Sequence, residues 1–445
     1  MKIPYAIPVV LALLFQCSAS GDDWNQWLGN NRDGIWKESG ILKKFPDGGP
    51  KVVWKTEIGS GYAGPAVANG NVFVMDRKVA DSATLPKSAF ERGEIPGKER
   101  VLCLNAADGE VRWEHGYDAN YTVSYASGPR VTPTVDGDRV YSLGAEGLLV
   151  CLNTADGNPL WQCDLKSTYA KKTPVWGFAG HPLVVDDLLI CLAGGDGSIA
   201  VAFDKRTGEE KWRALSAKEP GYSPPTLIEH GGRKQVILWH PEAVNSLDPV
   251  SGNVLWTIPW QLRSGLSIPT PQLDGDWLFL TCFYNGSLML QLKPDQTTPE
   301  ILWQTEKVSE SNTTHLNSIM STPYLKDDHI YGVCSYGEFR CLEAATGRRV
   351  WENMTPTTGQ GKKERWANVF LTPHGNRFFL FNESGHLIIT ELSPAGYKEI
   401  DRAPLIKPNG IDLKRRPIVW SHPAYAGRRI YLRNDTEIRC ISLAE

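Results

Sequence analysis

The chain has 445 residues, of which 41% are hydrophobic and 22% are charged, and its formal net charge is -3. These values are ordinary for a soluble globular protein and exclude a strongly basic surface for nucleic acid. The 42 glycines, 30 prolines and 16 tryptophans indicate a turn-rich, aromatic-rich β protein.

The first 20 residues have the pattern of a secretory signal peptide. Lys2 precedes the apolar run Ile7–Phe15, and the small residues Ser18–Ser20 follow it. We therefore expect export to the periplasm or the extracellular space, with a mature chain that starts near Gly21. A lipid anchor on Cys17 is the competing interpretation. No other stretch approaches the roughly 20 apolar residues of a membrane span.

A hairpin turn containing glycine recurs along the chain, with a large residue four positions after the glycine. Glycine suits the positive φ of a tight hairpin, and the flanking residues alternate as in strands. The large residues are Trp54, Trp113, Trp161, Trp212, Trp256, Trp303, Trp351 and Ile400. From Trp113 onward they recur every 44 to 51 residues. This spacing predicts one propeller blade per repeat, with each large ring between adjacent blades.

A proline marks the start of the first strand in most repeats. Proline has no backbone donor and is tolerated at the first residue of a strand, so we interpret these strands as the innermost ones. The prolines are Pro65, Pro133, Pro182, Pro225, Pro271, Pro323 and Pro423, and Asn368 takes the corresponding place in the seventh repeat.

The eighth repeat contains only three predicted strands before Glu445. The segment Val52–Thr56, near the other end of the chain, has the pattern of the missing outer strand. Pairing the two would close the ring and remove two open strand edges. The sequence therefore predicts an all-β, eight-bladed propeller of four-stranded blades over residues 51–445, preceded by a leader segment, 21–50.

Eight cysteines follow Cys17, and their positions indicate mainly buried structural thiols. Cys103, Cys151 and Cys341 each lie ten residues before a blade tryptophan. Cys334 and Cys341 flank a short turn, so a disulfide between them is one possibility and two buried thiols the other. No spacing typical of a haem or zinc site is present.

The repeated turns carry a family resemblance. The segments that end in Trp113 and Trp351 resemble the turns of the pyrroloquinoline-quinone-like (PQQ-like) β-propeller repeat family. The leader 24–34, with its sequence WNQWLGNNRDG, resembles the opening of secreted members from planctomycete-type bacteria. The family includes quinoprotein dehydrogenases and the propeller lipoprotein of the outer-membrane β-barrel assembly machinery.

The resemblance to the dehydrogenases implies a PQQ-dependent oxidation of an alcohol or sugar. In those enzymes PQQ lies over a tryptophan floor, Ca²⁺ is held by Glu, Asn and Asp, and an Asp acts as base. A disulfide between adjacent cysteines covers the cofactor there, and this sequence has no Cys-Cys pair. Carboxylates that could still reach the channel from loops are Glu219, Glu310, Glu364 and Asp412.

Residues one and three places before each strand-opening proline are expected to face the central channel. None of them is acidic, and several are aromatic or cationic. With two loop tryptophans, they predict a ligand-binding mouth made of Tyr62, Arg130, Trp176, His181, Tyr222, Arg365, Trp366, Trp420 and His422. We expect Trp366 to lie in a loop outside the core. The competing interpretation is that the aromatic residues only fill the channel.

These observations favour a non-enzymatic binding or scaffold propeller that recognises a protein, a peptide or a carbohydrate at the channel mouth. We expect a monomer without a cofactor, a metal ion or a nucleic-acid partner. The alternative is a quinoprotein dehydrogenase, with PQQ and calcium as its cofactors.

Overall fold

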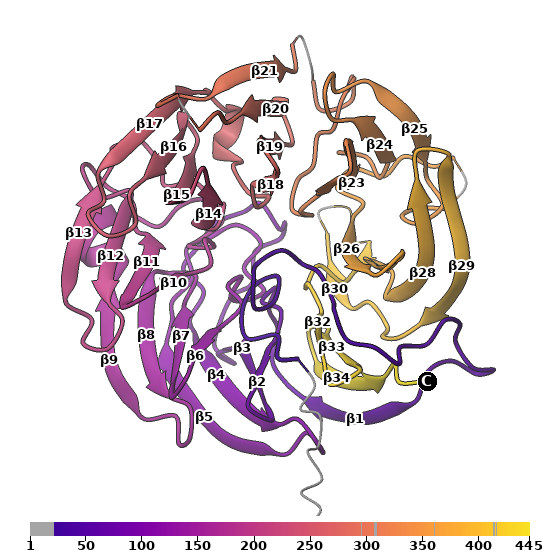
Figure 1. The fold of residues 1–445 in the computed structure, drawn as a ribbon. Helices are drawn as coiled ribbons and strands as arrows, with labels where there is room; N and C mark the ends of the chain where they lie inside the picture. Colours follow the sequence, from indigo (N-terminus) through magenta and orange to yellow (C-terminus); the bar gives the residue numbers. More distant parts are fainter. Residues whose placement is uncertain (1–21, 295, 307–308, 360, 413, 415) are drawn as a thin grey trace, which may run out of the picture.

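The protein is described by a computed structural model that covers residues 22–294, 296–306, 309–359, 361–412, 414 and 416–445. The predicted signal peptide and Cys17 lie outside these residues. Within them, eight four-stranded antiparallel sheets surround a central axis (Figure 1). Two short helical turns, Lys166–Ala170 and Arg263–Gly265, interrupt the loops. The predicted eight-bladed propeller is confirmed.

The first four blades follow one another along the chain, each running from the inner to the outer strand. Blade 1 contains β2 (Ala66–Ala68), β3 (Asn71–Val79), β4 (Gly97–Asn105) and β5 (Val111–Asp118). Blade 2 contains β6 (Thr134–Asp136), β7 (Arg139–Leu143), β8 (Leu148–Asn153) and β9 (Pro159–Asp164). Blade 3 contains β10 (Leu183–Val185), β11 (Leu188–Leu192), β12 (Ala200–Asp204) and β13 (Glu210–Ala214). Blade 4 contains β14 (Thr226–His230), β15 (Arg233–His240), β16 (Ala243–Leu247) and β17 (Val254–Pro259).

Blades 5 to 7 repeat this order, and blade 8 has three strands of its own. Blade 5 contains β18 (Gln272–Asp274), β19 (Trp277–Cys282), β20 (Gly286–Gln291) and β21 (Glu300–Gln304). Blade 6 contains β22 (Tyr324–Lys326), β23 (His329–Val333), β24 (Phe339–Glu343) and β25 (Arg349–Asn353). Blade 7 contains β26 (Val369–His374), β27 (Arg377–Asn382), β28 (His386–Ser393) and β29 (Gly396–Pro404). The remaining strands are β30 (Gly410–Ile411), β31 (Pro417–Ile418), β32 (Ala424–Ala426), β33 (Arg429–Arg433) and β34 (Glu437–Ser442).

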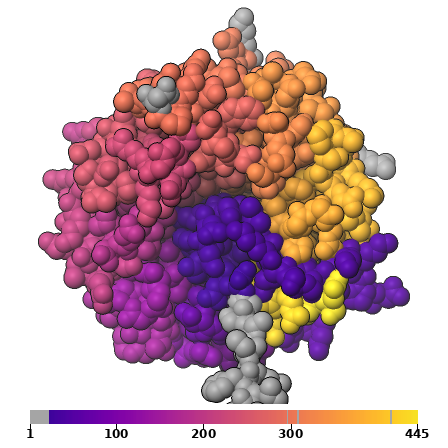
Figure 2. Space-filling model, in the orientation of Figure 1, coloured from indigo at the N-terminus to yellow at the C-terminus, as the bar shows by residue number. Residues whose placement is uncertain are grey.

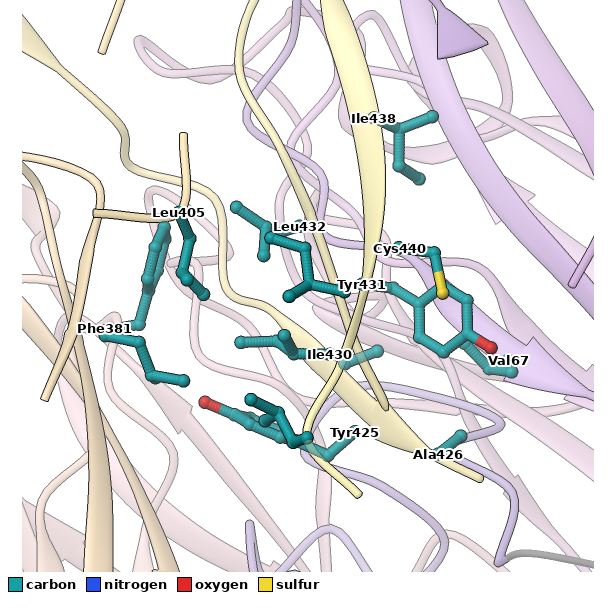
Figure 3. Packing of buried hydrophobic residues seen from close by; sticks show 14 of the residues in the cluster. Val67, Phe381, Leu405, Tyr425, Ala426, Ile430, Tyr431, Leu432, Ile438 and Cys440 are labelled. Atoms are coloured by element: carbon teal, nitrogen blue, oxygen red, sulfur yellow. The ribbon is translucent and has the colours of Figure 1, made fainter. Parts of the chain in front are cut away.

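The ring closes as the sequence predicts, because β1 (Val52–Glu57) is the outer strand of blade 8. It pairs antiparallel with β34 and places Trp54 opposite Cys440. Figure 3 shows the buried side chains at this closure, where Tyr431 and Cys440 of blade 8 share a core with Phe381 of blade 7. Burying this apolar surface stabilises the junction between the two ends of the ring.

Six of the blade tryptophans donate a hydrogen bond from the indole N–H to a turn of the next blade. The indole N–H of Trp113, for example, donates to the carbonyl of Thr154 at 2.9 Å. A Cβ atom added at Gly157 in the same turn would lie 2.5 Å from the Trp113 ring. Trp256 differs, since its indole N–H donates to Gln235 of its own blade at 3.1 Å. The six rings that donate to the next blade therefore lie against it.

The candidate disulfide between Cys334 and Cys341 is absent, because both residues are free thiols. Cys341 lies opposite Tyr331 in the hairpin of blade 6, so its neighbour across the strands is not Cys334. Cys334 instead begins the turn, where its backbone N–H donates to the carbonyl of Glu338 at 2.8 Å. The register of this hairpin therefore separates the two sulfur atoms.

The leader, residues 22–50, crosses one end of the central channel. In Figure 2 its indigo atoms cover the centre of the face that is shown. Trp24 exchanges backbone hydrogen bonds with Val67 in blade 1, and Trp36 packs against Phe379 of blade 7 with a ring-centroid separation of 5.2 Å. Buried leader side chains thus connect blades that are distant in sequence.

Candidate functional site

A cavity of about 410 Å³ lies at the mouth end of the channel. Aromatic and aliphatic side chains from all parts of the ring line it. The lining residues are Trp27, Tyr62, Phe90, Tyr125, Arg130, Trp176, Ala179, His181, Tyr222, Pro224, Ser264, Leu266, Ile268, Phe283, Tyr284, Ile319, Met320, Trp366, Phe370, Trp420 and His422. Its size and apolar character are typical of a small-molecule or side-chain binding site.

The structure brings together nearly all of the mouth residues that the sequence indicates. The cavity is lined by Tyr62, Arg130, Trp176, His181, Tyr222, Trp366, Trp420 and His422. They converge because each innermost strand begins at the same end of the ring, so equivalent positions meet at the axis.

Arg365 is the predicted mouth residue that does not line the cavity. Its guanidinium carbon lies over the Trp366 ring, 4.5 Å from the ring centroid. The same side chain forms an ion pair with Glu310. Trp366 also differs from the expectation, since only 7% of its surface is exposed. It packs edge-on against Phe90 and Tyr125 and belongs to the core of the mouth.

Arg130 is the one arginine or lysine among the lining residues. Its guanidinium donates to the backbone carbonyls of Ser124 at 2.8 Å and Tyr125 at 2.6 Å. It also lies over the ring of Tyr62, 5.3 Å from the centroid. Within the described residues no carboxylate forms an ion pair with it, so its positive charge is available to an anionic group in the cavity.

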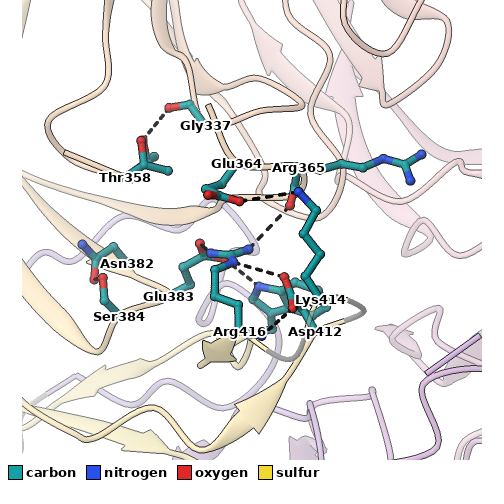
Figure 4. Close-up of polar contacts among 12 residues, drawn as sticks. Gly337, Thr358, Glu364, Arg365, Asn382, Glu383, Ser384, Asp412, Lys414 and Arg416 are labelled. Carbon is teal, nitrogen blue, oxygen red and sulfur yellow. Dashed lines mark hydrogen bonds and ion pairs between the residues drawn. The ribbon is translucent and has the colours of Figure 1, made fainter. Parts of the chain in front are cut away.

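A polar network that includes Glu383, Arg416 and Asp412 lies beside the mouth (Figure 4), and it holds Trp420. Its indole N–H donates to Glu383 at 2.9 Å, and Glu383 forms an ion pair with Arg416. The Nε atom of Arg416 in turn lies 3.1 Å from Oδ2 of Asp412. Burial raises the pKa of Glu383, and the neighbouring Arg416 acts in the opposite direction. The network fixes one wall of the cavity.

Trp27 of the leader forms the floor of the cavity together with two histidines. The Trp27 and His181 rings stack with centroids 4.2 Å apart, and His422 meets Trp27 edge-on at 5.0 Å. Burial lowers the pKa of His181 well below its usual value of 6.5 and lowers that of His422 to about 4. Both imidazoles are therefore neutral at neutral pH.

Arg32 fastens the leader beneath this floor. Its guanidinium donates to the backbone carbonyls of His181 at 3.1 Å, Pro182 at 3.0 Å and Pro225 at 3.2 Å. These bonds span blades 3 and 4, and burial lowers the pKa of Arg32 to about 9. The leader is therefore part of the site as well as of the fold.

Sequence reasoning missed several lining residues, above all Trp27, Phe90 and Tyr125. Trp27 lies in the leader, and its only sequence signal is a large apolar ring in a polar segment. Phe90 and Tyr125 lie in loops, where no periodic pattern indicates which side chain turns inward. Their places depend on contacts between loops, such as the hydrogen bond from the backbone N–H of Tyr125 to the carbonyl of Ala89 at 2.6 Å.

The donor set of the cavity does not fit PQQ with Ca²⁺. Its described lining contains no carboxylate, and the described residues include no group of three His, Cys, Asp or Glu that could hold a metal ion. Three of the four loop carboxylates form ion pairs: Glu310 with Arg365, Asp412 with Arg416, and Glu364 with Lys362. Ca²⁺ requires six to eight oxygen ligands, several of them carboxylate.

Comparison with known proteins supports the family and the fold. The family profile described as outer membrane protein assembly factor BamB matches residues 97–353, more than half of the chain. No curated protein matches the sequence. None of the helices among the described residues has the length and apolar character that a membrane span needs.

The solved structures similar to this chain include a BamB protein and two dehydrogenases. BamB from Moraxella catarrhalis is 15% identical, with a TM-score of 0.55 over 87% of this chain and 97% of that protein. Quinohemoprotein alcohol dehydrogenase from Comamonas testosteroni is 13% identical, with a TM-score of 0.59 over 95% of this chain and 80% of that protein. Europium-containing methanol dehydrogenase is 12% identical, with a TM-score of 0.60 over 95% of this chain and 98% of that protein. At these identities the similarity concerns the fold.

Proposed function

The chain belongs to the family described as outer membrane protein assembly factor BamB, and on this premise we propose that it is an exported binding propeller. In this proposal it recognises a ligand or a protein partner with the cavity at the channel mouth. The observation that carries the proposal is the composition of that cavity, which combines an apolar aromatic lining with Arg130. Such a lining favours binding, because it supplies a large apolar contact area and one positive charge.

Arg130 gives the proposed site a preference for anionic ligands such as acidic peptides. Its guanidinium is already held by backbone carbonyls, so little side-chain entropy is lost on binding. The preference should weaken as salt is added, because screening reduces the attraction between charges at the mouth.

A thermal-shift screen of the full exported chain tests the proposal. The probes are acidic peptides, neutral peptides and oligosaccharides, since a ligand that binds only the native state raises the melting temperature. Arg130→Ala should remove the gain from acidic peptides. Arg206→Ala is the matched control, because Arg206 is exposed in a turn of blade 3. A gain that survives equally in both variants would place binding outside the mouth and contradict the proposal.

The alternative function is that of a PQQ-dependent dehydrogenase. The fold that this chain shares with the two dehydrogenases favours it. The residues of the cavity argue against a dehydrogenase, because the described lining has no carboxylate for Ca²⁺. Dye reduction by the purified chain with an alcohol or sugar distinguishes the two functions. Activity that depends on added PQQ and Ca²⁺ would replace the binding proposal with the dehydrogenase.

A further inference from the structure

The positive charge in the cavity lies beside a wall of aromatic rings. The guanidinium of Arg130 donates to the backbone carbonyl of Tyr125 at 2.6 Å. The tyrosine ring packs against Phe90, Trp366 and Trp420, with centroids 5.3, 6.3 and 5.9 Å away. All five residues line the cavity. A ligand group that meets Arg130 in the cavity is therefore close to large apolar surfaces.

The described lining supplies a single positive charge without an ion-pair partner. Arg130 is its one arginine or lysine, and the floor histidines His181 and His422 are neutral because burial lowers their pKa values. Arg365 does not line the cavity and forms an ion pair with Glu310. A ligand with two negative charges would therefore bring one of them into apolar surroundings without a partner, which is unfavourable. The cavity suits a ligand with one negative charge.

The contacts of Arg130 leave its charge to be balanced by a ligand. Among the described residues it forms three hydrogen bonds, all to backbone carbonyls: those of Ser124, Tyr125 and Gly128. Carbonyl groups are uncharged, so they orient the guanidinium without neutralising it. A phosphate monoester carries about −1.5 to −2 charges at pH 7, whereas a carboxylate carries one. The carboxylate is therefore the better match.

The rest of the cavity favours an apolar group next to the carboxylate. Its volume of about 410 Å³ is far larger than a carboxylate needs, and most of its lining is aromatic or aliphatic. Two of the lining hydroxyl groups are bonded within the protein, since Tyr62 donates to Ser127 and Tyr284 accepts from Arg365. An apolar group gains free energy when it leaves water for such walls. The other hydroxyl groups of the lining make a polyhydroxylated acid the main competitor.

We infer that the cavity selects a hydrophobic monocarboxylate, with the carboxylate beside Arg130 and an apolar group against the aromatic wall. The inference rests on the proposed function, because it names the ligand class of the same cavity. It separates this class from acids with two charges, from polyhydroxylated acids and from neutral apolar molecules. The carboxylate can come from the C-terminus of a peptide whose last residue is apolar, or from a free carboxylic acid.

Paired probes that differ in the carboxylate alone test the inference on the full exported chain by calorimetry. The small-molecule pair is 3-phenylpropionate and 3-phenylpropanamide, and the peptide pair is acetyl-Gly-Gly-Phe with a free and with an amidated C-terminus. We expect the carboxylate to bind about tenfold tighter or more, because charged partners form the stronger contacts with a guanidinium. A preference in the peptide pair identifies a peptide end, and one confined to the small-molecule pair identifies a free acid; either supports the inference.

Two further probes test the number of charges and the need for an apolar group. Benzylsuccinate adds a second carboxylate to 3-phenylpropionate, and glucuronate replaces the apolar ring with a hydroxylated one. Each should bind about tenfold more weakly than 3-phenylpropionate or worse. The first brings an unpaired charge into the cavity, and the second lacks the apolar surface.

Substitution of two arginines gives a second readout. Arg130→Gln keeps a polar side chain and removes the charge, so the preference for carboxylate over amide should fall below about threefold. Arg263→Gln is the matched control, because the guanidinium of Arg263 also lies over a mouth tyrosine, 4.7 Å from the Tyr284 ring centroid, but Arg263 does not line the cavity. Its preference should equal that of the native chain. Circular dichroism of each variant establishes that the ring is folded.

Four outcomes would overturn the inference. Equal binding of carboxylate and amide in both pairs would show that the cavity does not recognise the charge. Benzylsuccinate or glucuronate binding as tightly as 3-phenylpropionate would assign another class of ligand. Equal effects of the two substitutions would replace a contact at Arg130 with general attraction to positive charge. The lack of binding by every probe at millimolar concentration would also refute it, while the proposed function would still stand if acidic peptides with amidated C-termini bind and Arg130→Ala abolishes their binding.

Discussion

Trp54, in the outer strand of blade 8, lies directly on Gly109 in the outer turn of blade 1. A Cβ atom at position 109 would lie 2.5 Å from Cε3 of the Trp54 ring, and the Trp54 indole N–H donates to the carbonyl of Ala106 at 3.0 Å. The contact joins the strand that closes the ring to the first complete blade. Gly109 thus has two reasons to be glycine: its φ of +79° and the lack of room for a side chain.

Gly109→Ala separates these two reasons when it is compared with Gly137→Ala. Gly137 also has a positive φ, but nothing lies within 4 Å of a Cβ atom there. We expect Gly137→Ala to cost about 1 kcal/mol, from backbone conformation alone. Gly109→Ala should cost a further 1–3 kcal/mol or so, because the Trp54 ring must move. Urea denaturation measures both, and equal losses would refute a role for the ring contact.

Trp256→Ala and Trp366→Ala should differ in stability although both side chains are buried. Trp256 packs in the core between blades 4 and 5, so its removal leaves a cavity that costs about 3–5 kcal/mol. Trp366 borders the mouth cavity, so its removal enlarges an existing space and costs roughly 2 kcal/mol. Equal free energies of unfolding for the two variants would show that Trp366 is as much a core residue as Trp256.

Two truncations distinguish the leader from the closing strand. Deletion through Thr56 removes β1 and exposes the edge of β34, so aggregation or a large loss of stability is expected. Deletion of residues 21–35 keeps β1 but removes Trp27 and Arg32 from the channel. That chain should remain a soluble monomer with a lower melting temperature and a mouth open at its floor. Size-exclusion chromatography and thermal melting of both chains provide the measurement; a soluble chain without β1 and with an unchanged melting temperature would contradict closure.

His422 predicts that stability falls as the pH is lowered below about 6.5. Burial lowers the pKa of His422 to about 4 in the folded state, against about 6.5 in the unfolded chain. Between these values the unfolded state takes up a proton that the folded state does not, so the free energy of unfolding decreases with falling pH. The full effect is about 3 kcal/mol.

His422→Gln isolates this contribution, because glutamine does not titrate. Between pH 6.5 and pH 4, the variant should lose less stability than the native chain. Other buried groups, such as Glu99 and Glu383 with raised pKa values, are the same in both proteins and cancel in the comparison. Parallel curves of unfolding free energy against pH would mean that His422 does not contribute.

The eight blades and their closure could be predicted because the signals for them are local. In each blade a few neighbouring residues specify the turn between two strands. The alternation of apolar and polar positions specifies each strand. The last repeat lacks an outer strand, so Val52–Thr56 was predicted to supply it, and β1 (Val52–Glu57) confirms this. Ten of the 21 lining residues stand one or three places before a strand-opening proline, and they could be predicted for the same reason, since equivalent positions in a closed ring meet at its axis.

The sequence by itself determined the ring, because turn chemistry and strand periodicity are written in contiguous residues. The tertiary structure alone decided that Trp27 forms the floor of the cavity, that Glu310 pairs with Arg365, and that Cys334 lies apart from Cys341. It also decided the tautomers of the floor histidines, which depend on single backbone groups. These features arise from contacts between loops and a leader far apart in the chain, where no local periodicity indicates which side chains meet.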